Sequence, residues 1–465
     1  EGGIFMAALK RIALFLLIFS SLWATAVFAE ELSVRDEINQ LKERITALEK
    51  RVLGQDEYIA TQNSTVQVQQ QKITEYESRL AQFEEHLHRV PGIPMQLMEG
   101  LELGAGATFI VQGTNNVNYG GDGQTQKKDR TDGSYSADIT LAKEFKEVDG
   151  RAFLHLEAGQ GAGLEDNLTL YSNVNRDAGD SDAKVEVTEL WYEQNLFKDK
   201  AALTFGKLDP TAYFDQNEVA NDETTQFLGR IFRNSPTAEF PDNNAGIRIA
   251  YLPFEWLELG YGIFNAKGSW EKIGDNLFNI GQVSFRTNFL NLPGNYRFYG
   301  WTNNANHTKW LDREKTKETA YGFGLSFDQK ANDIVTFFAR YGWQNPKVYN
   351  PDITATGDDE ADPRYFSLEQ SWSVGFQVEG KPWGREKDVF AFAVGQAMPS
   401  DDYKKANEGF LAKTEGHLEA YYRIHVNDHL SISPDFQYIW NPFGKDVAGD
   451  TAPIFVGGMR AQVDF

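Results

Sequence analysis

Sixteen short segments in which polar and apolar residues alternate occupy the chain from residue 101 to the C-terminus. A period of two predicts strands with one apolar face and one water-facing side. The connections alternate between short turns, such as residues 291–294, and long polar loops, such as residues 209–243. An even strand number with such connections is typical of a bacterial outer-membrane β-barrel, with short turns in the periplasm and long loops outside. We therefore predict a 16-stranded antiparallel transmembrane β-barrel over residues 101–465. Its strands are expected to begin near Leu101, Ser134, Arg151, Lys184, Ala201, Asn244, Glu255, Leu277, Asn295, Thr319, Asp333, Glu369, Asp388, Gly416, His429 and Pro453.

The composition and the final segment support this prediction. The chain has 41 Gly, 33 Phe and 19 Tyr but no Cys, and its mean hydropathy of -0.48 makes it polar on average. Up to the terminal Phe465 the last segment alternates strictly, with Met459 and Val463 on one face and Arg460 on the other. An aromatic residue that closes such a strand resembles the signal for insertion into the outer membrane. The net charge of -22 argues against nucleic acid as a partner.

Residues 1–29 have the pattern of a secretory signal peptide, with residues 1–5 as an upstream extension. Lys10 and Arg11 precede an apolar run that ends with the small residue Ala29, the expected cleavage point. The alternative is an uncleaved anchor helix, which would need about 20 apolar residues, more than the run supplies. Together with the predicted strands, this segment indicates export to the outer membrane of a Gram-negative cell.

A seven-residue period characterises residues 30–90, where apolar residues recur at every seventh position from Ile38 onward beside a second such series. This pattern predicts an α-helical coiled-coil stalk in the periplasm, which the prolines of a linker at residues 91–100 would end. A coiled coil needs a partner helix, so we expect self-association through the barrel and the coiled coil, and the β-branched residues of the first series allow a dimer on packing rules alone. Two roles remain open for the stalk, namely contact with peptidoglycan and simple stapling of the oligomer.

Six separate motifs occur in the order found in one known family. They are ELWYEQNLFKDKAALTFGKLDP, YFDQNEVANDETTQFLGRIFRNSP, AGIRIAYLPFEWLELGYGIFNA, LPGNYRFYGWTNN, FFARYGW and LEAYYRIHVNDHLSISPDFQYIWNPFG. These motifs resemble the carbohydrate-selective porins of the OprB type over about residues 100–465, and the coiled coil resembles the N-terminal extension of some family members. The resemblance implies a trimeric outer-membrane channel for the passive diffusion of monosaccharides and similar small solutes, without indicating which sugar.

Two other functions remain open at this point. The chain could be a structural tether between the outer membrane and peptidoglycan with an incidental pore, or a general or anion-preferring porin, which its water-facing arginines suggest. No Ser, His and Asp combination and no zinc-protease spacing can be proposed, so we do not expect an enzyme.

Charged residues on the water-facing side of the strands are candidates for lining the pore, because a charge at the lipid midplane costs about 2–4 kcal/mol. Opposed arginines and carboxylates offer hydrogen-bond donors and acceptors to hydroxyl-rich solutes, and flat rings suit the apolar face of a pyranose. The candidates are Glu189, Trp191, Glu193, Arg230, Arg233, Arg248, Arg286, Arg297, Trp301, Arg340, Glu419, Arg423, Asp435, Gln437 and Arg460. Further aromatic candidates are Tyr299, Phe338 and Tyr421.

The third long loop, residues 209–243, is the expected constriction, as in many porins. It carries Arg230 and Arg233 and the further candidate charges Asp215, Glu218 and Glu239. The strand before it requires a bulge near Thr188, because Val185 and Val187 share the parity of Glu189 and all three would otherwise lie on one face.

No cofactor is expected, with one metal site left for consideration. Asp177, Asp180 and Asp182 offer hard oxygen ligands to a structural Ca²⁺ ion, although their spacing is not that of an EF-hand. The alternative is a hydrated acidic loop that divalent ions bridge to lipopolysaccharide. The partners that we expect are sugar solutes, outer-membrane lipid and lipopolysaccharide, further copies of the chain, and peptidoglycan for the stalk.

Overall fold

The structure is a computed structural model, in which the chain divides into two units, Glu1–Leu97 and Met98–Phe465. It describes residues 42, 44–46, 100–118, 129–177, 184–289, 291–355, 364–447 and 451–465. In the first unit, residues 42 and 44–46 are helical. The predicted signal peptide, most of the predicted coiled coil and all but the last residue of the linker lie outside the described residues. Across the described ranges, no helix is long and apolar enough to cross a membrane.

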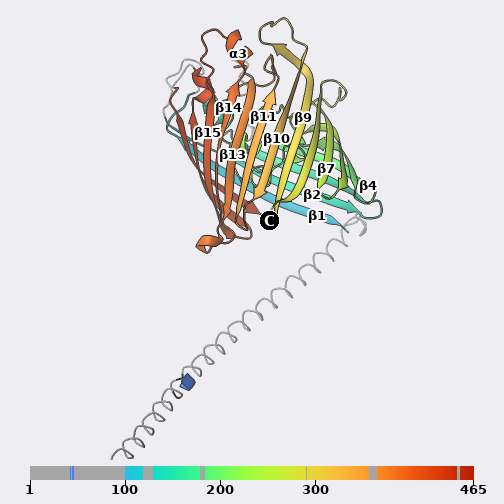
Figure 1. The fold of residues 1–465 in the computed structure, drawn as a ribbon, viewed down its shortest axis with the longest axis vertical. Coiled ribbons are helices and arrows are strands. Elements are labelled where there is room, and N and C mark those ends of the chain that lie inside the picture. The colour runs from blue at the N-terminus through green and yellow to red at the C-terminus, as the bar shows by residue number, and fades with distance from the viewer. Residues whose placement is uncertain are drawn as a thin grey trace, which may run out of the picture. The chain divides into compact units, whose positions relative to one another are not determined.

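The second unit is a closed antiparallel β-barrel of sixteen strands (Figure 1). Each strand pairs with the next along the chain, and β1 closes the ring by pairing with β17, with Ile110 opposite Arg460. β12, Val348–Tyr349, is a two-residue pairing with the end of β9 and is not a barrel strand. The barrel strands are β1 Leu101–Thr114, β2 Arg130–Phe145, β3 Gly150–Gln160, β4 Lys184–Leu196, β5 Ala201–Leu208, β6 Asn244–Phe254, β7 Leu257–Asn265, β8 Leu277–Phe289, β9 Leu292–Lys309, β10 Glu318–Lys330, β11 Val335–Gln344, β13 Leu368–Glu379, β14 Val389–Pro399, β15 Glu415–Asn427, β16 Leu430–Trp440 and β17 Ile454–Asp464.

The predicted strand number and order are confirmed. The largest shift in a strand start is at β2, which begins at Arg130 instead of near Ser134, because residues 130–133 continue the pairing with β1. Turn residues blurred the alternation there, so the prediction began the strand too late.

Alternation along the strands separates an outer apolar face from an inner polar one. On β6, Ile247 and Ile249 are 55% and 52% exposed on the outside, while Arg248 between them points into the barrel. The bulge predicted near Thr188 is present, because the β3–β4 register shifts there and pairs His155 with Glu189 but Leu156 with Val187. The shift turns Glu189 inward although Val187 faces outward.

Gly206 on β5 lies directly opposite this part of β4. Its φ of 141° belongs to a region that favours glycine, and a Cβ atom there would lie 2.2 Å from the carbonyl oxygen of Leu190. The close approach of the two strands therefore requires glycine at this position.

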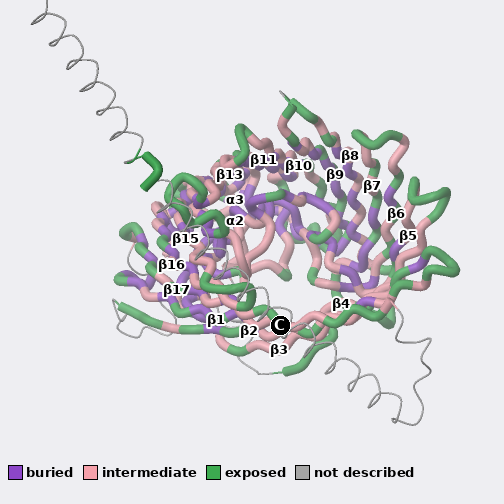
Figure 2. Tube along the Cα trace, turned by 90° about the horizontal axis from the view of Figure 1, so that it is seen from below, coloured by how far each residue is buried: buried purple, intermediate pink, exposed green. Residues whose placement is uncertain are grey.

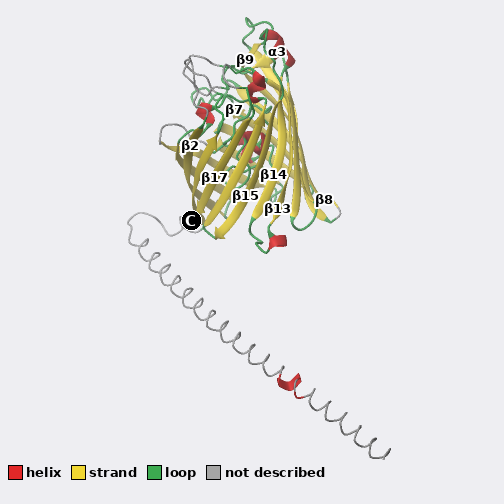
Figure 3. Ribbon diagram, turned by 90° about the vertical axis from the view of Figure 1, so that its left-hand side faces the viewer, coloured by secondary structure: helices red, strands yellow, loops and turns green. Residues whose placement is uncertain are grey.

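Short helices belong to the connections and not to the barrel wall (Figure 3). α3, Asp401–Ala406, begins after Ser400, whose hydroxyl caps it by accepting a hydrogen bond from the Tyr403 amide. The other helices described in this unit are α2 Arg230–Arg233 and the 3₁₀ turns η3 Glu165–Asn167, η4 Pro210–Ala212, η5 Lys381–Trp383 and η6 Pro442–Lys445.

Two long connections fold into the barrel, and we call them L2 (described residues 161–177) and L3 (residues 209–243). Phe227 and Phe232 of L3 pack inside against Phe338 and Tyr421 of the wall. Buried segments that include α2 accordingly lie inside the ring of strands (Figure 2). L2 packs in the same way through a second cluster on the inner face of β16 and β17, made of Leu164, Leu168, Leu170, Val174, Ile439, Ile454 and Val456.

Candidate functional site

A buried ion pair fastens L3 to the barrel wall. Asp215 has no exposed surface, and its Oδ1 accepts a hydrogen bond from Nε of Arg340 on β11 at 3.3 Å. Arg340 also donates to the carbonyl oxygens of Asp215, at 2.9 Å, and Phe232. Burial raises the pKa of Asp215, while the Arg340 charge and the amide of Ser235, 2.8 Å from Oδ2, act in the opposite direction. Loss of either charged partner would leave an uncompensated buried charge, which is strongly destabilising.

Two further wall residues hold the middle of L3. Glu419 on β15 accepts hydrogen bonds from the amides of Leu228 and Gly229 at 2.6 and 2.9 Å. Arg460 on β17 donates to the carbonyl oxygens of Glu223 and Gln226, both at 2.7 Å. L3 therefore reaches from the end of β5 to the wall formed by β15–β17 and narrows the lumen.

L2 is joined to L3 by backbone hydrogen bonds. The Arg176 amide donates to the carbonyl oxygen of Leu228 at 2.9 Å, and the Arg230 amide donates to that of Asn173 at 3.2 Å. These bonds bring Arg176 and Arg230, which belong to different loops, to the same side of the lumen.

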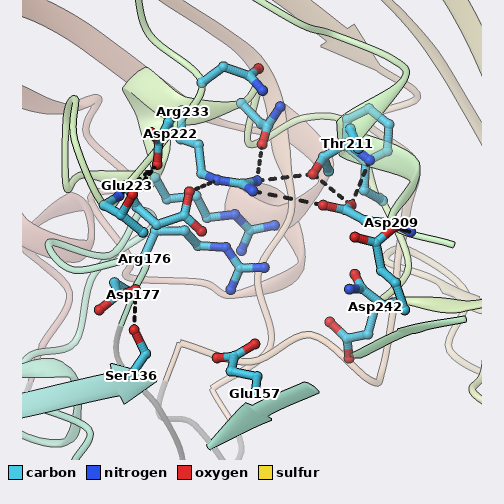
Figure 4. Close-up of a pocket in the computed structure, with 18 of the residues that line it drawn as sticks. Ser136, Glu157, Arg176, Asp177, Asp209, Thr211, Asp222, Glu223, Arg233 and Asp242 are labelled. Carbon is cyan, nitrogen blue, oxygen red and sulfur yellow. Dashed lines mark hydrogen bonds and ion pairs between the residues drawn. The ribbon is translucent and has the colours of Figure 1, made fainter. Parts of the chain in front are cut away.

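A cavity of about 660 Å³ lies between the two loops and strands β2–β4. Its lining is unevenly charged, with eight carboxylates against three arginines and one histidine, His155. Arg176 and Arg233 lie on one side, and Glu157 and Asp242 lie across the gap from them (Figure 4). The charged members are Arg176, Arg230, Arg233, Asp138, Glu157, Asp177, Glu189, Asp209, Asp222, Glu223 and Asp242.

Some of these charges are paired and others face the cavity without a partner. Arg233 forms ion pairs with Glu223 and, at 3.9 Å, with Asp209. In the described part of the chain, by contrast, the side chains of Arg176, Arg230 and Glu157 have no ion pair or hydrogen bond. The unpaired groups are those available to a solute.

The pKa values of charged groups in the two loops are shifted by burial and by neighbouring charges. Burial and the adjacent Arg176 lower the pKa of Arg230 to about 10, so Arg230 remains charged at neutral pH. Burial and the nearby Glu223 raise the pKa of Asp177 to about 8. Asp177 therefore keeps its proton at neutral pH in the absence of a cation.

Three of the residues predicted from the sequence line this cavity, namely Glu189, Arg230 and Arg233. Trp191 lies beside it, where its indole donates to Glu189 at 3.1 Å and stacks on Phe153 with ring centroids 5.0 Å apart.

Three other predicted residues form a separate network on the inner wall. Arg248 pairs with Glu193 at 3.6 Å and with Glu258 at 3.4 Å, and its guanidinium lies 4.5 Å from the ring centroid of Tyr213. Arg286 pairs with Glu258 as well. This network lies toward the short-turn end of the barrel, and so does Arg423, which is half-buried on β15. A role in contacting solutes stays a prediction for all of them.

For seven predicted residues the structure corrects the assignment. They point inward but are at most 9% exposed, because L2 and L3 cover them, and they do not line the cavity: Arg297, Trp301, Arg340, Glu419, Asp435, Gln437 and Arg460. Most of them hold the loops in place. Arg297, for example, pairs at 2.6 Å with Asp328, which accepts from the Glu218 amide of L3, and Gln437 donates to the Val174 carbonyl of L2 at 2.8 Å.

The same correction applies to the remaining aromatic and loop candidates. Tyr299, Phe338 and Tyr421 are 4% exposed or less and pack beneath L3. Asp215 and Glu239 bond to the wall instead of facing the pore, Glu239 through His307 at 2.7 Å.

Several lining residues were missed by the sequence argument. Asp138, His155 and Glu157 are inward-facing members of β2 and β3, and the parity argument applied to these strands would have found them. Arg176 belongs to L2, which was expected to lie outside, although the apolar Leu164 in that loop is a sign of packing against the wall.

The proposed calcium ligands are only partly within view. Asp177 is described and accepts a hydrogen bond from the Ser136 hydroxyl at 3.0 Å, whereas Asp180 and Asp182 lie outside the described residues. Within the described ranges, no group of three or more His, Cys, Asp or Glu side chains is arranged to hold a metal ion.

The chain is similar to porins of known sequence and structure. It is 24% identical over 266 residues to an uncharacterized protein of Aquifex aeolicus, covering 57% of this chain and 65% of that protein, just under two thirds of its length. It is 23% identical over 330 residues to Porin B of Pseudomonas aeruginosa, covering 60% of this chain and 68% of Porin B. A high-pH structure of Pseudomonas putida OprB shares the fold, with a TM-score of 0.64 and 18% identity over 80% of this chain and 96% of that one. The model of the family described as "Carbohydrate-selective porin, OprB family" matches residues 127–465, and the chain therefore belongs to the OprB family of outer-membrane porins.

Proposed function

We propose that the chain mediates passive diffusion of carbohydrates, namely monosaccharides and similar small solutes, across the outer membrane. The observation that carries this proposal is the cavity lined by the guanidiniums of Arg176 and Arg230 and by the carboxylate of Glu157, none of which has a partner among the described residues, with Glu157 across the gap from Arg176. Its volume of about 660 Å³ is within the range of pockets that hold small ligands, roughly 300–1,000 Å³.

Such a lining suits a neutral polyol. A hydroxyl group both donates and accepts, so one sugar can accept from the arginine side and donate to the carboxylate side at the same time. The solute then exchanges its hydrogen bonds to water for hydrogen bonds to the wall at little net cost, which permits both entry and release. Membership of a carbohydrate-selective family agrees with this choice of solute.

The ratio of charges argues against the alternative of an anion-preferring porin. Eight carboxylates against three arginines leave the cavity negative at neutral pH, even with Asp177 protonated. Since a charged lining attracts ions of the opposite sign, we expect small cations to pass in preference to anions.

We also propose that the chain is a homotrimer whose predicted coiled coil, residues 30–90, lies in the periplasm. The heptad pattern of the sequence supports the coiled coil and therefore self-association, and the number of three copies is what the resemblance to the family implies. Deletion of residues 30–90 separates a porin from a structural tether, because a tether would lose its attachment to peptidoglycan while a porin would keep its sugar flux.

Conductance in planar bilayers tests the proposed solute. Glucose should reduce the ion conductance of single channels in a saturable way, while an osmolyte of similar size that lacks hydroxyl groups should not. If no sugar changes the conductance, the assignment to carbohydrates is refuted even though the chain remains a porin.

A further inference from the structure

L2 reaches the constriction as a hairpin whose two arms are tied together by one carboxylate. Oε1 of Glu165, in the 3₁₀ turn at the start of the hairpin, accepts hydrogen bonds from the amides of Val174 and Asn175 at 2.9 and 2.8 Å. The next residue is Arg176, one of the two guanidiniums in the cavity that have no partner among the described residues. The bonds to Glu165 therefore fix the backbone from which the Arg176 side chain extends.

Other contacts hold the same arm, and two of them involve carboxylates. Glu415 of β15 accepts hydrogen bonds from the amides of Tyr171 and Ser172 at 3.0 and 3.1 Å, and Asp177 accepts from the Ser136 hydroxyl at 3.0 Å. The Val174 carbonyl accepts from Gln437 at 2.8 Å and from Gln112 at 3.3 Å, and the side-chain amide of Asn175 donates to the Ser134 hydroxyl at 3.0 Å. Glu165 is the carboxylate that ties the two residues directly before Arg176, so its charge state can change the hold on Arg176.

On this basis we propose that Glu165 is a positioning residue, a proton-sensitive latch that sets the place of Arg176 in the constriction. This inference rests on the proposed function, since it concerns regulation of the same cavity. Glu165, which lies outside the solute path, would then control the position of Arg176, which lies inside it.

The sign of the pH response follows from the surroundings of Glu165. Burial is the largest influence and raises the pKa of Glu165 to about 7, against 4.5 for the free side chain, although the two amides and the Arg176 charge act in the opposite direction. The docked hairpin therefore binds a proton more tightly than a released hairpin, in which Glu165 would meet water. Acid pH favours docking, and docking weakens as the pH rises from about 4.5 to about 7, above which the effect levels off.

Among the described residues, the charged groups that act on Glu165 include Arg176 and Asp166 of L2, and Arg230 approaches from L3. On the wall, Asp132 of β2 accepts from the neighbouring Asn167 at 3.0 Å. Asp177, on the same hairpin, titrates at about pH 8 and adds a response of the same sign, so a test must separate the two carboxylates.

The variant Glu165→Gln separates the effect of Glu165 from that of Asp177. Glutamine keeps an oxygen acceptor for both amides and cannot titrate. With pKa values of about 7 docked and 4.5 released, the ratio of released to docked hairpin should rise about 30-fold between pH 5.5 and 8.5 through Glu165 alone. The frequency of transient openings in single-channel records, taken as wild type divided by Glu165→Gln at each pH, should change by this factor. Asp177 is common to both channels and cancels in the ratio.

Two more variants complete the experiment. Glu165→Ala removes the tie and should open frequently at both pH values, whereas Asp166→Asn, a matched change at the exposed neighbouring carboxylate, should follow the wild type. The latch is overturned if wild type and Glu165→Gln share one pH profile, or if Glu165→Ala behaves as the wild type. Block by glucose, recorded in the same channels, reports separately on the proposed function. Its absence would refute the proposal that the solutes are carbohydrates, while the opening frequencies would still test the latch.

Discussion

Replacement of Arg340 by Met should release L3 from the barrel wall. Methionine retains most of the aliphatic stem but none of the donors, so Asp215 loses its ion pair and the carbonyl oxygens of Asp215 and Phe232 lose their donor. Asp215 is completely buried, and removal of one partner of a buried pair costs about 3–5 kcal/mol. About a hundredfold to a few thousandfold more molecules should then have L3 undocked, since each 1.4 kcal/mol is about a factor of ten.

The assay combines single-channel conductance with trypsin cleavage after Arg230 and Arg233, which are accessible to the protease only when L3 leaves the wall. Arg340→Met should show larger and noisier conductance and faster cleavage. Arg286→Met is the matched control, because Arg286 is on the same inner wall but its side chain is 52% exposed, and loss of such an ion pair costs about 1 kcal/mol or less. The double variant Asp215→Asn with Arg340→Met should recover part of the loss, since no uncompensated charge remains. Wild-type conductance and cleavage in Arg340→Met would refute the conclusion that this ion pair holds the constriction in place.

Three further outcomes are expected. Replacing Arg176 and Arg230 together by Gln should weaken glucose block and increase the preference for K⁺ over Cl⁻, measured as a reversal potential in a KCl gradient, because the cavity loses its two unpaired positive charges; an unchanged reversal potential would show that these residues do not line the conduction path. Gly206→Ala should slow or prevent barrel assembly, seen as loss of the folded band in unheated gel electrophoresis, because a Cβ atom would lie 2.2 Å from the Leu190 carbonyl; normal assembly would mean that β4 and β5 can separate at this point. Asp388→Asn should lower the melting temperature at pH 7 but not near pH 2, because hydrogen bonds from Arg385 lower the pKa of Asp388 to about 2. The stabilisation by Asp388 is therefore present above the free value of 3.8 and is lost as the pH falls through 2. An equal difference in melting temperature at both pH values would contradict this assignment.

The strand pattern was predictable because the membrane imposes one simple rule. Every second residue must suit lipid, so parity alone placed Arg248 inside and Ile247 outside, and the conflict between Val187 and Glu189 was enough to predict the bulge at Thr188. Family motifs and the even count of strands led to the same fold.

The candidate site was less predictable, because parity says which way a side chain points and not what covers it. Arg340 and Arg230 look alike in sequence, yet one is buried under L3 and the other lines the cavity. The inward fold of L2 depends on the fit of Leu164 and Val174 against Ile454 on a strand almost 300 positions away, and such long-range packing leaves no periodic trace in a loop.

The attachment of L3 has a practical consequence for changing what the channel admits. Its buried contacts are made with Arg340, Glu419 and Arg460 of the wall, whereas the side chains of Arg176, Arg230 and Glu157 line the cavity and form no ion pair or hydrogen bond with the described residues. The residues that hold L3 in place and the residues that line the cavity are therefore different sets. Substitution of the cavity residues, one charge at a time, should therefore change which solutes pass while the barrel keeps its fold.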